Sequence, residues 1–336
     1  MASLADLKTC LDSSKKIAIF SHTIPDADAF CSTFALKAII EANYKDDKKI
    51  IDIFIDYGDE VAPLYAPIVG DRRLNFQRTS KYDLAIALDS PQTGRFQKYS
   101  YLFDGATQTV NIDHHSTNAN FAGLNYVYEN ASSTGEVVYQ IAKKLGLEIS
   151  LEAAKNVFTS IITDTVCLTQ SNVSKNTYKI LAELSAMDFD QEEIKNYFFK
   201  NNTKAKTLLL EKAISSIKFY EEDKIAIMKI QNKDLEKLNA TQEDTLGIVE
   251  HANNIDGVVL AAIIIERAPN QFYVSLRSKG EVNITKVAEH FGGGGHSNMA
   301  AFQSEGELSK LSAAFVKEYI TALNENESKQ ELSNEN

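Results

Sequence analysis

The chain has 336 residues, a formal net charge of -11 and 44% hydrophobic residues. This length predicts two domains of ordinary size, each with its own core. The acidic balance argues against a protein that coats long duplex DNA, which needs a broad basic surface. It leaves room for a small anionic substrate held in a local positive pocket.

The three cysteines, Cys10, Cys31 and Cys167, lie far apart and form no Cys-x-x-Cys pair. We interpret them as reduced thiols of a cytoplasmic protein rather than as a disulfide framework or a zinc site. Residues 1–16 contain no apolar stretch of signal-peptide length, and the longest wholly apolar run, 258–265, is too short to span a bilayer. We therefore expect a soluble, cytoplasmic protein with no membrane partner.

The first half of the chain alternates short apolar runs with helix-like segments. We expect strands at 16–21, 50–56, 83–88 and 109–112, and helices at 29–42, 135–145 and 151–163. Asp28 is the expected N-cap of the first of these helices. Strands that alternate with helices predict an α/β fold with a doubly wound, mostly parallel sheet.

The second half restarts after a polar segment, residues 188–205, which we interpret as a helical linker. We expect strands at 224–230, 256–266 and 271–277, and helices at 284–291 and 308–323. The polar tail 324–336 is expected to be disordered. This predicts a catalytic domain at 1–187, the linker, a smaller α/β domain at 206–323 and the tail, with the active site in the cleft between the domains.

Acidic and imidazole side chains gather just past the apolar runs. They are His22, Asp26 and Asp28, then Asp89, then Asp113, His114 and His115. The carboxyl ends of parallel strands share one edge of a sheet, so we expect these side chains to meet there. We expect His114 and His115 to point to opposite sides of an extended chain, one holding a metal and the other facing substrate. Taken alone, the Asp-His-His sequence fits a hydrogen-bonded turn equally well.

Four carboxylates and two imidazoles make up the candidate metal ligands: His22, Asp26, Asp28, Asp89, His114 and Asp164. Such a set suits Mn²⁺ or Mg²⁺ better than Zn²⁺, although Co²⁺ or Zn²⁺ could compete. Four carboxylates balance the charge of two divalent cations and repel one another without them. Two cations about 3.5–4 Å apart are the usual arrangement for hydrolysing phosphate esters with an activated hydroxide.

These motifs, in this order, resemble the DHH phosphoesterase superfamily. The second half resembles its DHHA1 domain in Ser275-Leu-Arg277-Ser-Lys279-Gly280 and Phe291-Gly-Gly-Gly-Gly-His296, and the resemblance spans about residues 16–301. The two-domain form is most similar to the nanoRNase/pAp-phosphatase branch. That branch implies cleavage of very short RNA or DNA oligonucleotides and removal of a phosphate from 3′-phosphoadenosine 5′-phosphate (pAp).

The resemblance also implies a role for each residue of the site. It assigns one metal to His22, Asp26 and Asp89, and a second to Asp28, Asp89, His114 and Asp164. Asp89 would then bridge the two cations and act in catalysis together with His115, a phosphate contact or proton donor. Asp113 would be a structural partner of the site. Phe30 and Cys31 depart from the family pattern, in which small residues are more common.

The glycine run of the second half is a separate candidate site. Four consecutive glycines leave backbone N–H groups unshielded and able to surround an anion, although a flexible hinge fits the run as well. The candidate substrate-binding residues are Arg277, Gly294, Gly295 and His296, since arginine suits bidentate phosphate contacts. We expect this pocket to bind the nucleotide end away from the scissile phosphate, so that short substrates are favoured.

Other functions stay open. A phosphodiesterase of cyclic-dinucleotide turnover, acting on pApA or c-di-AMP, would use the same metals. An inorganic pyrophosphatase shares the ligands of the first domain but resembles the second domain less, and a long-strand exonuclease would be expected to carry an added nucleic-acid module. A non-catalytic nucleotide sensor is the alternative from a different class. The polarity of cleavage and the oligomeric state, including a homodimer, are also open.

Overall fold

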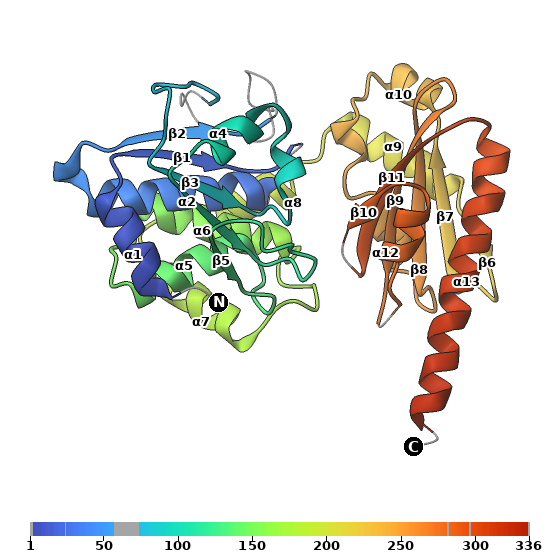
Figure 1. Ribbon diagram of the computed structural model, residues 1–336. Coiled ribbons are helices and arrows are strands. Elements are labelled where there is room, and N and C mark those ends of the chain that lie inside the picture. The colour runs from blue at the N-terminus through green and yellow to red at the C-terminus, as the bar shows by residue number, and fades with distance from the viewer. Residues whose placement is uncertain (1–2, 24, 57–73, 281, 296, 335–336) are drawn as a thin grey trace. The chain divides into compact units, whose positions relative to one another are not determined.

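The computed structural model describes residues 3–23, 25–56, 74–280, 282–295 and 297–334. The chain divides into two compact units, residues 1–200 and 201–336, each built on its own sheet (Figure 1). The expected linker, 188–205, is divided between them. Helix α8 (Gln191–Phe199) packs on the core of the first unit through Ile194, Phe198 and Phe199, whereas α9 (Lys204–Ser215) belongs to the second.

The first unit contains a five-stranded sheet with the strand order β2-β1-β3-β4-β5. Its strands are β1 (Lys16–Phe20), β2 (Ile50–Phe54), β3 (Leu84–Leu88), β4 (Gln108–Asp113) and β5 (Leu124–Val127), and each neighbouring pair is parallel. The predicted parallel sheet is therefore confirmed. Continuous apolar runs suit its central strands because both faces are covered. The short strand β5 was not predicted, since only four residues form it.

The α-helices among the described residues of the first unit are α1 (Leu4–Ser13), α2 (Ala27–Asn43), α4 (Ser100–Asp104), α5 (Thr134–Lys144), α6 (Leu151–Asp164), α7 (Lys175–Ser185) and α8. Helices α1, α2, α5 and α6 share one core with the isoleucine side of the sheet, whereas aromatic side chains such as Phe20, Phe54 and Phe103 cover the other side. The N-cap of α2 is Asp26, whose side chain accepts from Ala29 N, so the expected cap at Asp28 is wrong.

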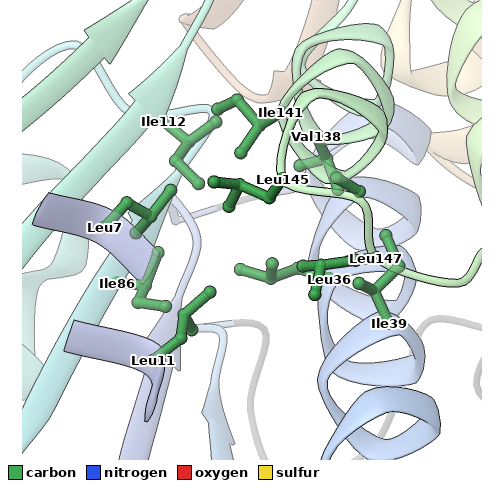
Figure 2. Close-up of a pocket in the computed structure, with 11 residues that line it drawn as sticks. Leu7, Leu11, Leu36, Ile39, Ile86, Ile112, Val138, Ile141, Leu145 and Leu147 are labelled. Atoms are coloured by element: carbon green, nitrogen blue, oxygen red, sulfur yellow. The ribbon is translucent and has the colours of Figure 1, made fainter. Parts of the chain in front are cut away.

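A small pocket lies inside the first core, between α1, α2, α5 and the sheet. Figure 2 shows its lining, which consists of apolar side chains that include Leu36, Ile86, Ile112 and Val138. Such a lining offers no group for chemistry. The pocket therefore belongs to the packing of the core, and it does not coincide with the polar cluster at the strand ends.

The second unit contains a six-stranded sheet with the order β10-β11-β9-β8-β7-β6. The strands are β6 (Lys218–Tyr220), β7 (Ile225–Ile230), β8 (Leu260–Ala268), β9 (Gln271–Ser278), β10 (Gly294–Gly295) and β11 (Met299–Glu305); β7 and β8 are parallel, and the other pairs are antiparallel. Helices α9, α10 (Asn232–Leu238) and α11 (Val249–Asn253) pack on one face of the sheet, and α12 (Thr285–His290) and α13 (Leu308–Asn334) on the other.

Helix α13 differs from the expectation at its end. It continues to Asn334 instead of ending near Leu323, so the tail that we expected to be disordered is helical as far as that residue. The tail is polar, but it consists largely of Glu, Lys, Gln, Ser and Asn, and the first three are good helix formers. The tail has too few apolar residues to form a core of its own, but it can still extend α13, which is already anchored to the core of the second unit. Among the helices of the described residues, none has the length and apolarity needed to cross a membrane.

Candidate active site

The site lies at the carboxyl edge of the first sheet. His22 follows β1, Asp89 follows β3, and His114 and His115 follow Asp113, the last residue of β4. Three groups of side chains lie there, and within each group the possible ligand atoms are all within 4.8 Å of one another. The groups are His22, Asp26 and Asp89; Asp28, His114 and Asp164; and Asp89, His114 and His115. The structure thus brings together all six residues that the sequence singled out as metal ligands, and adds His115 to them.

Asp89 belongs to two of these groups, and it approaches His114, which belongs to the third. Its Oδ2 lies 3.4 Å from His22 Nε2, and its Oδ1 lies 3.7 Å from His114 Nε2 and 3.6 Å from His115 Nδ1. The residue is buried and has a left-handed backbone with φ 53°, a conformation that Asp tolerates better than most residues. Burial works against its charge, but the hydrogen bond with His22 and the positive charges of the three imidazoles hold the pKa of Asp89 well below its usual range.

Asp28 is held by the amino end of α5 and by α6. Its Oδ2 accepts a hydrogen bond from Thr134 N at 2.7 Å, and its Oδ1 accepts from Gly135 N at 3.2 Å and from Ser160 Oγ at 2.5 Å. The first N–H groups of a helix have no partner inside the helix and therefore favour a carboxylate. The position of Asp28 in the first turn of α2 is thus fixed from two other helices.

The site carries more negative charge than the chain alone neutralises. Burial raises the pKa of Asp28 well above its usual value, and the neighbouring charges of Asp89 and Asp164 add to the shift. Burial also raises the pKa of Asp164, the last residue of α6, together with the charges of Asp26 and Asp89. Closely packed carboxylates with imidazoles and no thiolate are the donors that hard or borderline divalent cations prefer. The described residues therefore fit a divalent-cation centre.

The two adjacent histidines do not diverge, so the expectation that they point to opposite sides is wrong. Their ring centroids lie 4.9 Å apart at an interplanar angle of 74°, and both rings approach Asp89. The alternation of side chains applies inside a strand, whereas β4 ends at Asp113 and the chain turns at the histidines.

Asp113 orients His115. Its Oδ1 accepts from His114 N at 2.8 Å and lies 2.7 Å from His115 Nδ1, while Asn118 Nδ2 donates to its Oδ2 at 2.5 Å. Burial lowers the pKa of His115, but the hydrogen bond to Asp113 and the charges of Asp89 and Asp164 outweigh it and raise the pKa to about 9. His115 therefore holds a proton at neutral pH in the metal-free chain.

Two segments of the chain match known domain families. Residues 16–169 match the DHH family, N-terminal domain, and residues 222–324 match the DHHA1 domain. The chain belongs to the DHH family. It is therefore a DHH-family phosphoesterase, as the sequence resemblance predicted.

The similarity of this DHH-family phosphoesterase to two relatives extends over most of its length. It is 28% identical over 280 residues to the probable bifunctional oligoribonuclease and PAP phosphatase NrnA of Streptococcus mutans, covering 83% of this chain and 86% of that one. It is 25% identical over 321 residues to the cyclic-di-AMP phosphodiesterase GdpP of Geobacillus thermodenitrificans, covering 88% of this chain and 46% of that one.

A solved structure shares the fold. An exopolyphosphatase-related protein from Bacteroides fragilis superposes with a TM-score of 0.83 at 21% sequence identity, covering 96% of this chain and 95% of that one. At this identity the likeness concerns the fold.

In the DHHA1 domain, Arg277 lies near the end of β9, an interior strand of the sheet, whereas Gly294 and Gly295 form the edge strand β10. Arg277 Nε donates to Glu250 Oε1 at 2.5 Å, and its Nη1 donates to Ser275 Oγ at 3.2 Å and to Leu276 O at 2.8 Å. The guanidinium is therefore oriented by α11 and by its own strand, and its side chain is 15% exposed. His296 lies outside the described residues.

The last two glycines of the run form the strand β10 rather than a free loop. Gly294 and Gly295 pair with Ala301 and Ala300 of β11. A Cβ atom on Gly293 would lie 2.1 Å from Ala301 O, and one on Gly295, at φ 149°, would lie 2.4 Å from Met299 O. The lack of side chains at Gly293 and Gly295 thus permits a close approach of two backbones. This explanation of the glycines differs from the two that the sequence suggested, an anion-binding loop and a flexible hinge.

Thr134 and Ser160 are members of the site that sequence reasoning missed. The segment Ser132-Ser133-Thr134 favours a helix cap, with a phosphate contact as the weaker interpretation, and Ser133 does cap α5 by accepting from Glu136 N at 3.1 Å. Ser160 lies four residues before Asp164, a spacing that puts both side chains on one face of α6. That spacing is the feature of the sequence that could have indicated Ser160 as a member of the site.

Proposed function

We propose that this phosphoesterase is a metal-dependent enzyme that degrades very short oligonucleotides to mononucleotides and dephosphorylates pAp to AMP. The observation that carries the proposal is that Asp89 belongs to two of the three groups of ligand atoms, while its Oδ1 lies 3.7 Å from His114 Nε2 of the third group. A shared carboxylate between two ligand sets is the arrangement that two cations acting on one phosphate require. The name of the Streptococcus mutans relative supports the choice of substrates.

The ligand assignment follows the ligand groups. One cation would be held by His22, Asp26 and Asp89, and the other by the group of Asp28, His114 and Asp164, with Asp89 as the proposed shared ligand. Mn²⁺ is the cation we propose first, with Mg²⁺ and Co²⁺ as alternatives. The bound cations would neutralise charge on the scissile phosphate and lower the pKa of a water molecule.

The residues of the chain supply proton transfer and binding. His115, whose Nδ1 is held by Asp113 at 2.7 Å, donates a proton to the leaving oxygen or contacts the phosphate. In the DHHA1 domain, Arg277 binds a second phosphate or the terminal nucleotide, with Gly294, Gly295 and His296 as further candidate contacts. A cytoplasmic location and a homodimer stay predictions.

A labelled dinucleotide incubated with Mn²⁺, with and without EDTA, tests the proposal. We expect release of mononucleotide with metal and none with chelator, and loss of activity in Asp89→Asn and His114→Ala. Asp46→Asn changes a carboxylate in the exposed turn after α2 and serves as the matched control. Activity that is indifferent to chelator would overturn the proposed mechanism.

The second candidate is a phosphodiesterase of cyclic-dinucleotide turnover, which the similarity to GdpP favours. A panel of pAp, pApA, longer RNA and c-di-AMP, timed under one Mn²⁺ concentration, separates the two functions. Comparable kcat/KM on pAp and pApA supports the first candidate, whereas turnover of pApA or c-di-AMP with little turnover of pAp supports the second. Nucleotide binding without turnover of any member would instead indicate a sensor.

A further inference from the structure

Thr134 donates hydrogen bonds to two carboxylates of the candidate cation centre, Asp28 and Asp89. Its backbone N–H donates to Asp28 Oδ2 at 2.7 Å, and its hydroxyl donates to Asp89 Oδ1 at 2.9 Å. Asp28 belongs to the ligand group with His114 and Asp164, whereas Asp89 belongs to the group with His22. One fully buried residue at the start of α5 thus links the two ligand sets.

The turn that carries Thr134 is anchored from behind. The carboxylate of Glu136, fully buried in α5, accepts from Ser132 N at 3.2 Å, from Ser132 Oγ at 2.6 Å and from Thr177 Oγ1 of α7 at 2.8 Å. These bonds tie the residues before α5 to a neighbouring helix. The hydrogen-bond donors of Thr134 are therefore fixed in direction before any cation is bound.

The neighbouring hydroxyls have different partners. Ser133 Oγ accepts from Glu136 N and also from Ser160 Oγ at 2.8 Å. The carboxylate to which Ser160 Oγ donates is that of Asp28. Thr134 is the residue of this segment whose recorded bonds reach both Asp28 and Asp89. A change in its hydroxyl therefore acts on the bridging carboxylate without removing the cap of the helix.

We propose that Thr134 is a positioning residue that couples the two cation sites by holding Asp28 and Asp89 at a fixed separation. The proposal rests on the proposed function, because it assumes that these carboxylates bind cations. Partners that orient metal ligands reduce the rotamer freedom lost on binding, and their removal typically weakens metal affinity about 10–100-fold. A hydroxyl bonded to the bridging carboxylate affects both sites together.

The test compares Thr134→Val, which keeps the shape and removes the hydroxyl, with Thr134→Ser, which keeps the hydroxyl. Calorimetric titration of Mn²⁺ into the EDTA-treated full chain measures affinity and stoichiometry independently of catalysis. We expect about 10–100-fold weaker Mn²⁺ binding in Thr134→Val, near wild-type binding in Thr134→Ser, and a loss in kcat for pAp with little change in KM. Should Thr134→Val not fold, Thr134→Ala takes its place in the same comparison.

Thr159→Val is the matched control. Thr159 is also a buried threonine, but its hydroxyl donates to Lys155 O within α6 and to none of the site carboxylates. We expect Thr159→Val to bind Mn²⁺ as the wild type does. Equal weakening in this control would show a general structural effect and overturn the positioning role.

The outcomes separate this proposal from the proposed function. If the wild type binds two Mn²⁺ ions and Thr134→Val binds them equally well, the positioning role fails and the function stands. If the wild type binds no Mn²⁺ while it is folded, both fail. If Thr134→Ser is as weak as Thr134→Val, the hydroxyl is not the cause and the positioning role fails.

Discussion

Gly135 lies so close to Ser160 that a Cβ atom on it would come within 2.1 Å of the serine Oγ and 2.6 Å of its Cβ. The contact joins the first turn of α5 to α6, and it places Gly135 N within hydrogen-bond distance of both Ser160 Oγ and Asp28 Oδ1. The absence of a side chain at position 135 is therefore what lets the two helices hold Asp28 between them.

We predict that Gly135→Ala destabilises the protein by about 1–3 kcal/mol, the usual effect of overpacking. Alanine in place of glycine in an ordinary helix has the opposite sign, with a gain of about 0.5–1 kcal/mol. Urea unfolding of the metal-free chain measures the difference. Gly94→Ala, where an added Cβ meets nothing within 4 Å, is the control and should leave stability nearly unchanged. A stabilised Gly135→Ala variant would contradict the close contact.

The stability of the metal-free chain should fall as the pH rises from about 5 to 9. Burial and neighbouring carboxylates raise the pKa of Asp28 and Asp164 above the usual 3.8. The folded state therefore holds these protons more tightly than the unfolded chain, and this contribution is complete below the unfolded pKa and is lost as the pH rises through the raised values. The pKa of His115, raised to about 9 by Asp113 and Asp89 against the effect of burial, acts in the same direction.

Mn²⁺ competes with these protons, so its stabilising effect should grow over the same range. Unfolding temperatures followed by circular dichroism at several pH values, with EDTA or with Mn²⁺, measure both effects. Asp28→Asn removes one of the shifted carboxyls and should flatten the metal-free curve. A metal-free unfolding temperature that increased toward pH 9 would refute the assignment of these shifts.

Replacement of His115 by Gln should lower kcat about 10²–10⁴-fold, the usual contribution of a general acid or base. Asp113→Asn removes the charge that helps to raise the pKa of His115, so its pKa should fall, as NMR titration of the metal-free protein can show. The Asp113→Asn variant should also shift the alkaline limb of the rate profile to lower pH. An unchanged pH profile of the Asp113→Asn enzyme would show that His115 does not transfer the proton.

Arg277→Ala should raise the KM for a dinucleotide about 10–100-fold with a smaller effect on kcat, because a hydrogen bond to a charged group contributes about 1.5–3 kcal/mol. Glu250→Gln removes the charged partner that orients the guanidinium and should raise KM by a smaller factor. Lys310→Ala changes an exposed cation of α13 and is the control. An unchanged KM in Arg277→Ala would show that the DHHA1 domain does not bind the substrate through this residue.

The sequence by itself determined the parallel sheet and the polar ends of its strands. Continuous apolar runs such as 84–88 indicate buried strands, and the residues that follow them, Asp89 and His114 among them, must meet at one edge because parallel strands end together. That topological rule explains why ligand candidates far apart in sequence could be grouped in advance.

Only the tertiary structure decided which donors hold those ligands. Ser160 lies 132 positions from Asp28 in the chain, and only the packing of α5 and α6 against α2 brings Thr134 and Ser160 to the carboxylates. The convergence of His114 and His115 depends on the turn after β4, and the glycines at 293 and 295 are explained by the neighbouring backbone of β11. Local patterns report what a segment prefers, whereas contacts between segments depend on how closely the finished helices and strands approach one another.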